Sequence, residues 1–207
     1  AADGQLEAVI SAGNTGAYAA ACQMRMRTLP GVLRPGIAVT LPTLSGPVVL
    51  CDVGANIAPK AAHLHQYALM ASVYAQAVLG VENPRVGLIS IGQEDAKGNE
   101  LVKSVNQSLR EEPRVNFVGN IEPRELMERP AEVFVCDGFV GNVILKLAEG
   151  LAKSLLSSFI REISQLNLPA DVSAKVAPAV KDFLAKHDYS EYGGAPLLGV
   201  DGVCIIC

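Results

Sequence analysis

The chain has 207 residues, a formal net charge of −4 and 50% hydrophobic residues, while only 18% of its residues are charged. This length allows one large or two small domains, the negative charge argues against broad nucleic-acid binding, and no apolar run reaches the roughly 18–20 residues of a transmembrane helix. The high apolar content is typical of a parallel sheet with both faces covered.

Predicted strands and helices alternate along the first two thirds of the chain, with short connections between them. This alternation indicates an α/β fold with an open, mostly parallel sheet flanked by helices. The predicted strands lie at 7–11, 37–41, 47–52, 86–91, 115–118, 132–136 and 203–207. The predicted helices lie at 15–28, 59–79, 99–112 and 123–128, and the strands at 37–41 and 47–52 form a hairpin.

A helical hairpin is predicted at about 139–187, within a single α/β domain that spans residues 1–207. Its first helix runs from Phe139 to about Gln165 and its second from about Val172 to His187, with apolar residues (Leu166, Leu168) near the tip. Three interpretations stay open: packing inside the protein, a homodimer contact, or a surface that rests on a membrane. The first helix carries an apolar stripe made of Val140, Ile144, Leu147, Leu151, Leu155, Phe159 and Ile163.

Three further features bear on partners and compartment. The five cysteines lack a disulfide framework's spacing, so we expect reduced thiols in a cytoplasmic protein, without a metal or other cofactor. No Asp or Glu occurs from Ala8 to Cys51, whereas Arg25, Arg27 and Arg34 do; this indicates either a solvated helix end or a basic patch for an acidic partner. The first residues resemble the end of a helix, and we interpret the chain as a piece of a longer protein.

Glycine-containing turns follow four predicted strands and lead into helical sequence. They lie at 11–17, 52–56, 90–98 and 137–142, and a fifth glycine segment lies at 192–199. A strand that ends in glycine before a helix leaves backbone N–H groups free for an anion. Each turn also has a structural interpretation, because glycine suits tight turns and Asp caps helices. Four such turns on one sheet would meet at one edge, as active-site turns do.

The turns carry mostly neutral amides, with one lysine and no recognisable nucleophile. Phosphate-binding P-loop, dinucleotide and hydrolase-elbow motifs are absent. Such a site suits substrates that supply both nucleophile and leaving group, as when phosphate attacks a thioester. The predicted catalytic residues are Lys97, Asn14, Asp137 and Asn142. The predicted substrate-binding residues are Gly13, Thr15, Gly16, Asp52, Gly54, Asn56, Gly138 and Gly141.

Within this scheme the roles are divided between side chains and backbone. Asn14, Thr15, Gly16 and Asn142 would hold phosphate, while Lys97 would polarise phosphate or the developing oxyanion. Asp52 and Asp137 would orient amides or accept a proton, and backbone amides at 54–56 and 138–141 would complete the cleft.

Several of these segments resemble the signature segments of the PlsX family, the bacterial phosphate acyltransferases of phospholipid synthesis. They are 11–17, 52–56, 97–101, 135–142 and 189–195, and they span the chain in the family's order. The resemblance implies conversion of acyl–acyl carrier protein and inorganic phosphate to acyl phosphate by a cytoplasmic homodimer with peripheral membrane contact. It also implies a fold similar to isopropylmalate dehydrogenase and phosphotransacetylase. Ser90 departs from the family, which often has Asn there.

Two other functions remain open. The first is a phosphate acetyltransferase that acts on acyl-CoA. The second is a non-catalytic scaffold that uses the Arg25–Arg34 segment and the hairpin to hold an acidic carrier protein. A decarboxylating dehydrogenase would share the implied fold, but the chain lacks the paired Asp spacing that its metal site needs.

Overall fold

The structure is a computed structural model that describes residues 4–43, 45–166, 169–186 and 193–207. It divides into two compact units. Unit 1 comprises Ala1–Val143 and Gly194–Cys207, and unit 2 comprises Ile144–Gly193.

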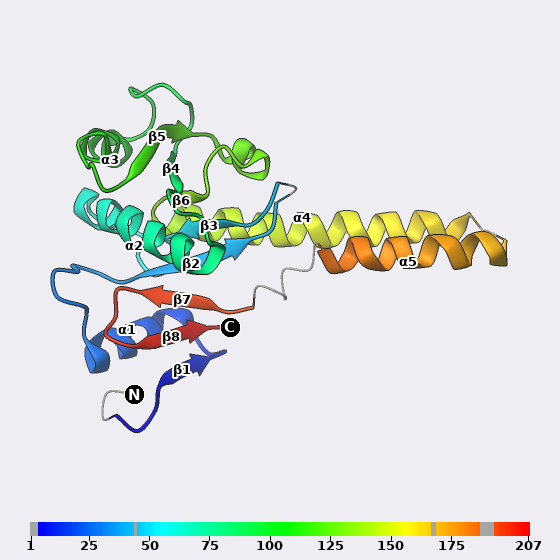
Figure 1. Cartoon of the computed structure of the whole chain (residues 1–207), viewed down its shortest axis with the longest axis horizontal. Coiled ribbons are helices and arrows are strands. Elements are labelled where there is room, and N and C mark those ends of the chain that lie inside the picture. The colour runs from blue at the N-terminus through cyan, green and yellow to red at the C-terminus, as the bar shows by residue number, and fades with distance from the viewer. Residues whose placement is uncertain (1–3, 44, 167–168, 187–192) are drawn as a thin grey trace. The chain divides into compact units, whose positions relative to one another are not determined.

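Unit 1 is built on an eight-stranded mixed sheet with the order β1-β8-β7-β2-β3-β6-β4-β5 (Figure 1). The parallel pairs are β1–β8, β3–β6, β6–β4 and β4–β5, and β2–β3, β2–β7 and β7–β8 are antiparallel. The predicted α/β class is confirmed. The strands are β1 (Ala8–Ser11), β2 (Gly36–Leu41), β3 (Val48–Cys51), β4 (Arg85–Ile89), β5 (Asn116–Ile121), β6 (Val133–Val135), β7 (Ala195–Leu198) and β8 (Val203–Ile206).

Helices cover this sheet through stripes of small and branched apolar residues. Helix α2 (Ala61–Leu79) packs on β3, β4 and β6, and α3 (Glu100–Arg110) packs on β4, β5 and α2. Alanines in α2, including Ala68, Ala71 and Ala75, are fully buried and allow the helix to approach the strands closely. Helix α1 (Thr15–Met26) packs on β8, and a short 3₁₀ helix spans Pro123–Glu128. These contacts fix the strand ends, from which the polar turns project.

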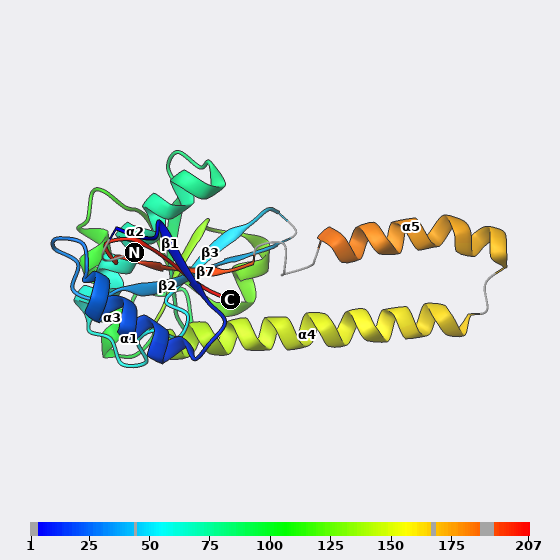
Figure 2. The ribbon, with the colours of Figure 1, turned by 90° about the horizontal axis from the view of Figure 1, so that it is seen from below.

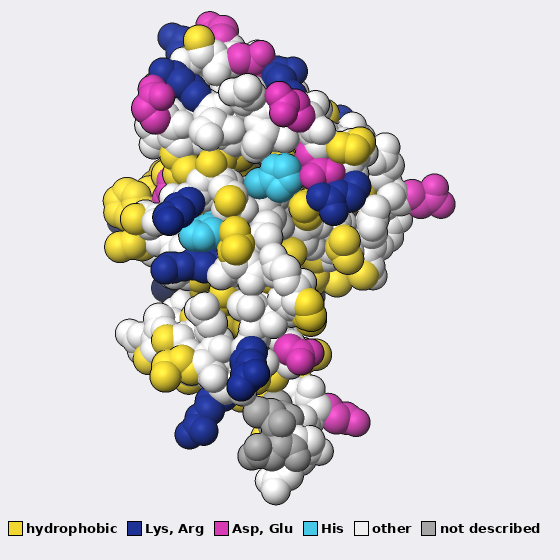
Figure 3. Space-filling view, turned by 90° about the vertical axis from the view of Figure 1, so that its left-hand side faces the viewer, with side chains coloured by type: hydrophobic (Ala, Val, Ile, Leu, Met, Phe, Trp, Pro, Cys, Tyr) yellow, Lys and Arg dark blue, Asp and Glu magenta, His cyan; other side chains and the backbone are white. Residues whose placement is uncertain are grey.

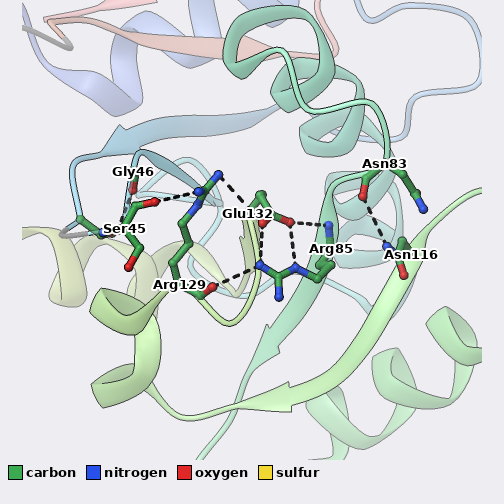
Figure 4. Close-up of polar contacts among 8 residues, drawn as sticks. Ser45, Gly46, Asn83, Arg85, Asn116, Arg129 and Glu132 are labelled. Carbon is green, nitrogen blue, oxygen red and sulfur yellow. Dashed lines mark hydrogen bonds and ion pairs between the residues drawn. The ribbon is translucent and has the colours of Figure 1, made fainter.

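The edge where β4 and β6 begin is closed by a network of charged groups. Arg85 donates to Glu132 from Nη2 at 2.6 Å and from Nε at 3.2 Å, and its backbone N–H donates to the same carboxylate at 2.8 Å (Figure 4). Arg129 donates to the Ser45 carbonyl at 2.8 Å and lies 3.9 Å from Glu132. Burial acts to raise the pKa of Glu132, but hydrogen bonds from Arg85 outweigh it and lower the pKa. At this edge two cations lie next to one carboxylate.

Unit 2 is a helical hairpin. It contains the part of α4 (Gly138–Gln165) from Ile144 onward and α5 (Ala170–Lys186), which returns antiparallel alongside α4 (Figure 2). Parts of the predicted break at 167–171, with Leu168, and the predicted helix end at His187 lie outside the described residues. An apolar groove of about 480 Å³ separates the helices; it is lined by Leu155, Leu156, Phe159, Ile163, Val176, Ala179 and Val180.

Within the described ranges, no helix combines the length and apolarity needed to cross a bilayer. All five cysteines are free, and only Cys207 is exposed.

Candidate functional site

Three of the four predicted turns lie at one edge of the sheet. Strands β3, β6 and β4 are parallel neighbours, so the residues that follow them share an edge. The start of β2 lies there too, because β2 runs antiparallel to β3. We call this edge the carboxyl edge; it comprises residues 34–37, 52–63, 90–99 and 136–142.

The first predicted turn lies at the opposite edge, so the expectation that four turns share one edge is wrong for it. β1 is parallel to β8, β8 is antiparallel to β7, and β7 is antiparallel to β2. β1 therefore runs against β3, and Gly13, Asn14, Thr15 and Gly16 follow its far end. The direction of β1 follows from its parallel pairing with β8, a long-range contact that no local pattern predicts.

Asn14 has a structural role in this turn. Its side-chain Oδ1 accepts the backbone N–H of Ala17 at 2.9 Å and thereby caps α1. The Gly13 N–H donates to Ser11 Oγ at 3.1 Å. Helix capping accounts for the Asn-Thr-Gly sequence without a ligand.

At the carboxyl edge, Asp52 organises the turn after β3. Its carboxylate is fully buried and accepts hydrogen bonds from the backbone N–H groups of Ile37 (3.0 Å), Ala55 (3.1 Å) and Asn56 (2.7 Å). Burial raises the pKa of Asp52, and these hydrogen bonds act against that rise. Because all its oxygens are occupied, Asp52 is a positioning residue in this structure.

Asn56 connects the turn to β2 and α2. Its side-chain NH₂ donates to the Pro35 carbonyl at 2.8 Å, to Tyr67 Oη at 2.7 Å and to Asp52 at 3.2 Å. Its Oδ1 accepts from Arg34 Nη1 at 3.3 Å. Burial, followed by the nearby Asp52 charge, raises the pKa of Tyr67, so the Tyr67 hydroxyl stays protonated. A buried amide thus holds an exposed guanidinium at the site.

The amides at the start of α4 are already used by the protein. Asp137 caps the helix: its Oδ1 accepts the Val140 N–H at 2.9 Å, and its carbonyl accepts the Gly141 N–H at 3.0 Å. The Gly138 N–H donates to the Asn56 carbonyl at 2.8 Å. The expectation that the amides at 138 and 141, together with those of Ala55 and Asn56, are free for an anion is therefore wrong.

The two glycines of α4 are needed for close packing. A Cβ on Gly141 would lie 1.9 Å from the Asp52 carbonyl oxygen, and one on Gly138 would lie 2.7 Å from the Asn56 carbonyl oxygen. Both distances are shorter than any real contact, so only glycine lets the helix approach this turn. A glycine after a strand and before a helix is expected both for close packing and for anion binding, so the sequence alone does not distinguish the two.

Asn142 and Lys97 present accessible polar groups at the carboxyl edge. Asn142 is exposed and lies against Gly54, whose φ is 95°. Lys97 is exposed in the loop after β4, and none of the ion pairs among the described residues involves its ammonium group. In the same loop the buried Ser90 hydroxyl has no hydrogen-bond partner.

Sequence reasoning did not assign Arg34, Lys60 and His63 to the site. Arg34 precedes β2, and Lys60 and His63 flank the start of α2, where the backbone N–H of Lys60 donates to His63 Nδ1 at 3.1 Å. Burial, followed by the Arg34 and Lys60 charges, lowers the pKa of His63. Figure 3 shows histidine and basic side chains together on this face, beside hydrophobic ones. The only hint of these cations in the sequence was the stretch from Ala8 to Cys51, which contains Arg34 and no acidic residue.

Large apolar side chains are exposed at the same edge. Ile57 is 73% exposed, Ile91 81% and Phe139 63%, and they follow β3, β4 and β6 respectively. Within the described part of the chain, no three His, Cys, Asp or Glu side chains are grouped so that they could hold a metal ion.

Comparisons with known proteins show a match to a protein family and similarity to phosphate acyltransferases. The family described as "Fatty acid synthesis protein" matches residues 1–207. The chain is 46% identical over 203 residues to a phosphate acyltransferase of Clostridium perfringens (strain SM101), covering 98% of this chain and 60% of that protein. It is 48% identical over 207 residues to a phosphate acyltransferase of Desulforamulus reducens, covering 99% and 61%. The chain therefore spans about three fifths of these relatives.

Solved structures of phosphotransacetylases share the fold. One from Streptococcus pyogenes matches with a TM-score of 0.59 and 19% identity, over 73% of this chain and 53% of that chain. The phosphotransacetylase EutD from Staphylococcus aureus matches with a TM-score of 0.55 and 18% identity, over the same shares.

Proposed function

The chain belongs to the fatty acid synthesis protein family, as its resemblance to the phosphate acyltransferases indicated, and we propose that the full-length protein transfers the acyl group of acyl–acyl carrier protein to inorganic phosphate. The observation that carries this proposal is a carboxyl edge with hydrogen-bond donors and no accessible thiol. Cys51 and Cys136 are buried there, and burial raises the pKa of both thiols well above its usual value. Such an edge suits a reaction in which a substrate, here phosphate, brings the nucleophile.

The reaction needs little covalent chemistry from the protein. A phosphate oxygen attacks the thioester carbonyl carbon and forms a C–O bond, and negative charge develops on the carbonyl oxygen. The C–S bond then breaks, so the products are an acyl phosphate and the carrier thiolate, which takes up a proton from water. Fixed donors that stabilise the developing oxyanion are the usual source of rate enhancement in such a transfer.

We assign Lys97 and Asn142 to that stabilisation, because both are exposed at the carboxyl edge. Asp137 fixes the start of α4 and so places Asn142, while Asp52, Gly54, Asn56, Gly138 and Gly141 shape the turn beside it. The exposed Ile57, Ile91 and Phe139 offer an apolar surface that suits an acyl chain. No step requires a cofactor.

The test is hydroxylamine trapping of acyl phosphate, made with the full-length protein with and without phosphate. We expect acyl hydroxamate only when phosphate and long-chain acyl–acyl carrier protein are both present. Phosphate-independent hydroxamate would mean that the protein itself takes the acyl group, and would contradict the proposal.

A phosphate acetyltransferase that acts on acyl-CoA is the second candidate, because the solved structures with this fold include phosphotransacetylases. Replacing the carrier substrate with acetyl-CoA in the same assay distinguishes the two, since only the acetyltransferase would then form acetyl phosphate. Binding of the carrier protein without any acyl phosphate formation would instead favour the scaffold function.

We also propose that the hairpin stripe mediates a homodimer. Leu147, Leu151, Leu155 and Phe159 are more than half exposed along α4. A charge inside an apolar dimer contact is costly, so Leu151→Asp is expected to convert a dimer into a monomer in size-exclusion chromatography with light scattering. Ser157→Asp adds the same charge at an exposed position on the opposite side of α4 from this stripe and should leave the dimer intact. A monomeric wild-type protein would refute this assignment.

Peripheral membrane contact of a cytoplasmic protein is the competing use of the same stripe. Cosedimentation of the wild-type protein with anionic lipid vesicles, lost in Leu151→Asp while the wild-type protein is monomeric without lipid, would favour that use over dimer formation.

A further inference from the structure

The cations at one edge of the sheet form ion pairs, whereas those at the carboxyl edge do not pair with any described residue. At the edge where β4 and β6 begin, Arg85 and Arg129 share the carboxylate of Glu132. At the carboxyl edge, Arg34 and Lys60 take part in none of the ion pairs among the described residues. Unpaired charges placed side by side repel each other, so an anion between them would be stabilised.

The structure holds these groups by contacts that leave their charges free. The Asn56 side chain, which is 9% exposed, accepts from one nitrogen of Arg34 at 3.3 Å, and its NH₂ group is fixed by Pro35 and Tyr67. A guanidinium has five N–H donors, and a single bond to a neutral amide leaves the other donors available.

His63 adds a neutral donor. Its Nδ1 accepts the backbone N–H of Lys60 at 3.1 Å, so Nδ1 carries no proton and the proton of the neutral ring is assigned to Nε2. Burial and the Arg34 and Lys60 charges lower the pKa of His63, which favours the neutral ring. Nε2–H is thus a third donor next to the two cations.

The start of α2 adds positive potential at the same site. Lys60 is the cap residue of this 19-residue helix, and the helix has no acidic residue in its first turn to offset its positive end. The charges of Arg34 and Lys60 both act on His63, and the positive end of the helix dipole lies at the same helix start.

We propose that Arg34, Lys60 and His63 form a binding site for a phosphate oxyanion at the start of α2. This inference deepens the proposed function, on which it rests, because it moves the phosphate from the Asn14 turn, at the opposite edge, to the carboxyl edge. The same chemistry has two sources: inorganic phosphate, or the phosphodiester of the carrier protein's prosthetic group.

Titration calorimetry of the full-length protein with inorganic phosphate tests the site directly. Arg34→Gln and Lys60→Gln are each expected to raise the Kd for phosphate about tenfold, and the double variant about 100-fold, since a charged hydrogen bond contributes about one factor of ten or more. Arg34→Lys keeps the charge and should restore part of the affinity. Arg25→Gln removes an equal charge from the exposed end of α1 and should leave the Kd unchanged.

A second titration with dimethyl phosphate identifies the source. Weaker binding than inorganic phosphate assigns the site to the free ion. Equal binding with the same dependence on Arg34 and Lys60 assigns it to a phosphodiester. Circular dichroism of each variant shows whether it is folded, and an unchanged Kd in the folded double variant overturns the proposal.

Failure of the site and failure of the function give different results. If wild-type protein traps no acyl phosphate but binds phosphate through Arg34 and Lys60, the site stands and the acyltransferase is wrong. If acyl phosphate forms and the double variant keeps the wild-type KM for phosphate, only the site is wrong.

Discussion

Asp52→Ala is expected to lower the free energy of unfolding by on the order of 4 kcal/mol, because it removes the shared acceptor of three backbone N–H groups in a buried turn. For a protein of this size the loss corresponds to a Tm lower by roughly 10 °C. Few single substitutions in the chain remove so many hydrogen bonds at once. Thermal unfolding of the full-length protein, followed by circular dichroism, measures the change.

Two variants define the cause. Asp52→Asn keeps the size of the side chain and one acceptor oxygen, but its NH₂ group faces N–H donors. Its free energy of unfolding should therefore lie between those of wild type and Asp52→Ala. Asp201→Ala removes a carboxylate from an exposed position and should stay within about 0.5 kcal/mol of wild type. If Asp52→Ala and Asp201→Ala have the same melting temperature, the stability of the turn does not depend on the Asp52 carboxylate.

Lys97→Ala is expected to reduce kcat/KM for phosphate-dependent thioester cleavage on the order of 100-fold, as the loss of one donor to a developing oxyanion does. The Lys97 side chain is exposed and forms no ion pair with any residue that the structure describes, so its removal should not change the melting temperature. The release of carrier thiol with and without phosphate gives the rate.

The matched control lies six residues further along. Lys103→Ala removes the same group from α3, where Lys103 pairs with Glu100, and should leave the rate unchanged. Lys97→Arg keeps a cation and should recover part of the activity. A Lys97→Ala protein within twofold of wild type would remove Lys97 from the catalytic group.

Much of the fold follows from local pattern. The β2–β3 hairpin, α2 and α3 were predictable because continuous apolar runs and helical spacing occur next to turn residues. β7 was missed because it has only four residues, contains Pro196 and follows two glycines, which together indicate a turn. β8 follows β7 directly in the chain, but the other partner, β2, is distant, so that pairing is a tertiary effect.

The meeting of three turns at one edge was predictable, whereas the position of the first turn and the contacts within the edge were not. Asp52, Asn56, Lys97, Asp137 and Asn142 do meet at one edge, as parallel strands require. Glycine alone, however, cannot distinguish a free amide from close packing, and only the structure shows that Gly138 and Gly141 are packed against the Asp52 turn. Arg34 and Lys60, which precede β2 and α2, were not assigned to the site because they lie in separate segments of the chain.

The pairing of the first strand with the last has a consequence for synthesis of the chain. Strands β2 to β6 find their partners within residues 36–135, whereas Ala8 pairs with Val203 and Gly36 with Leu198. Closing so long a loop is slow, so the β1–β8 pair forms late and the side of β2 that pairs with β7 stays free until the ribosome has made the distal segment. The free side of β2 is therefore where the nascent chain is most open to pairing with a wrong strand.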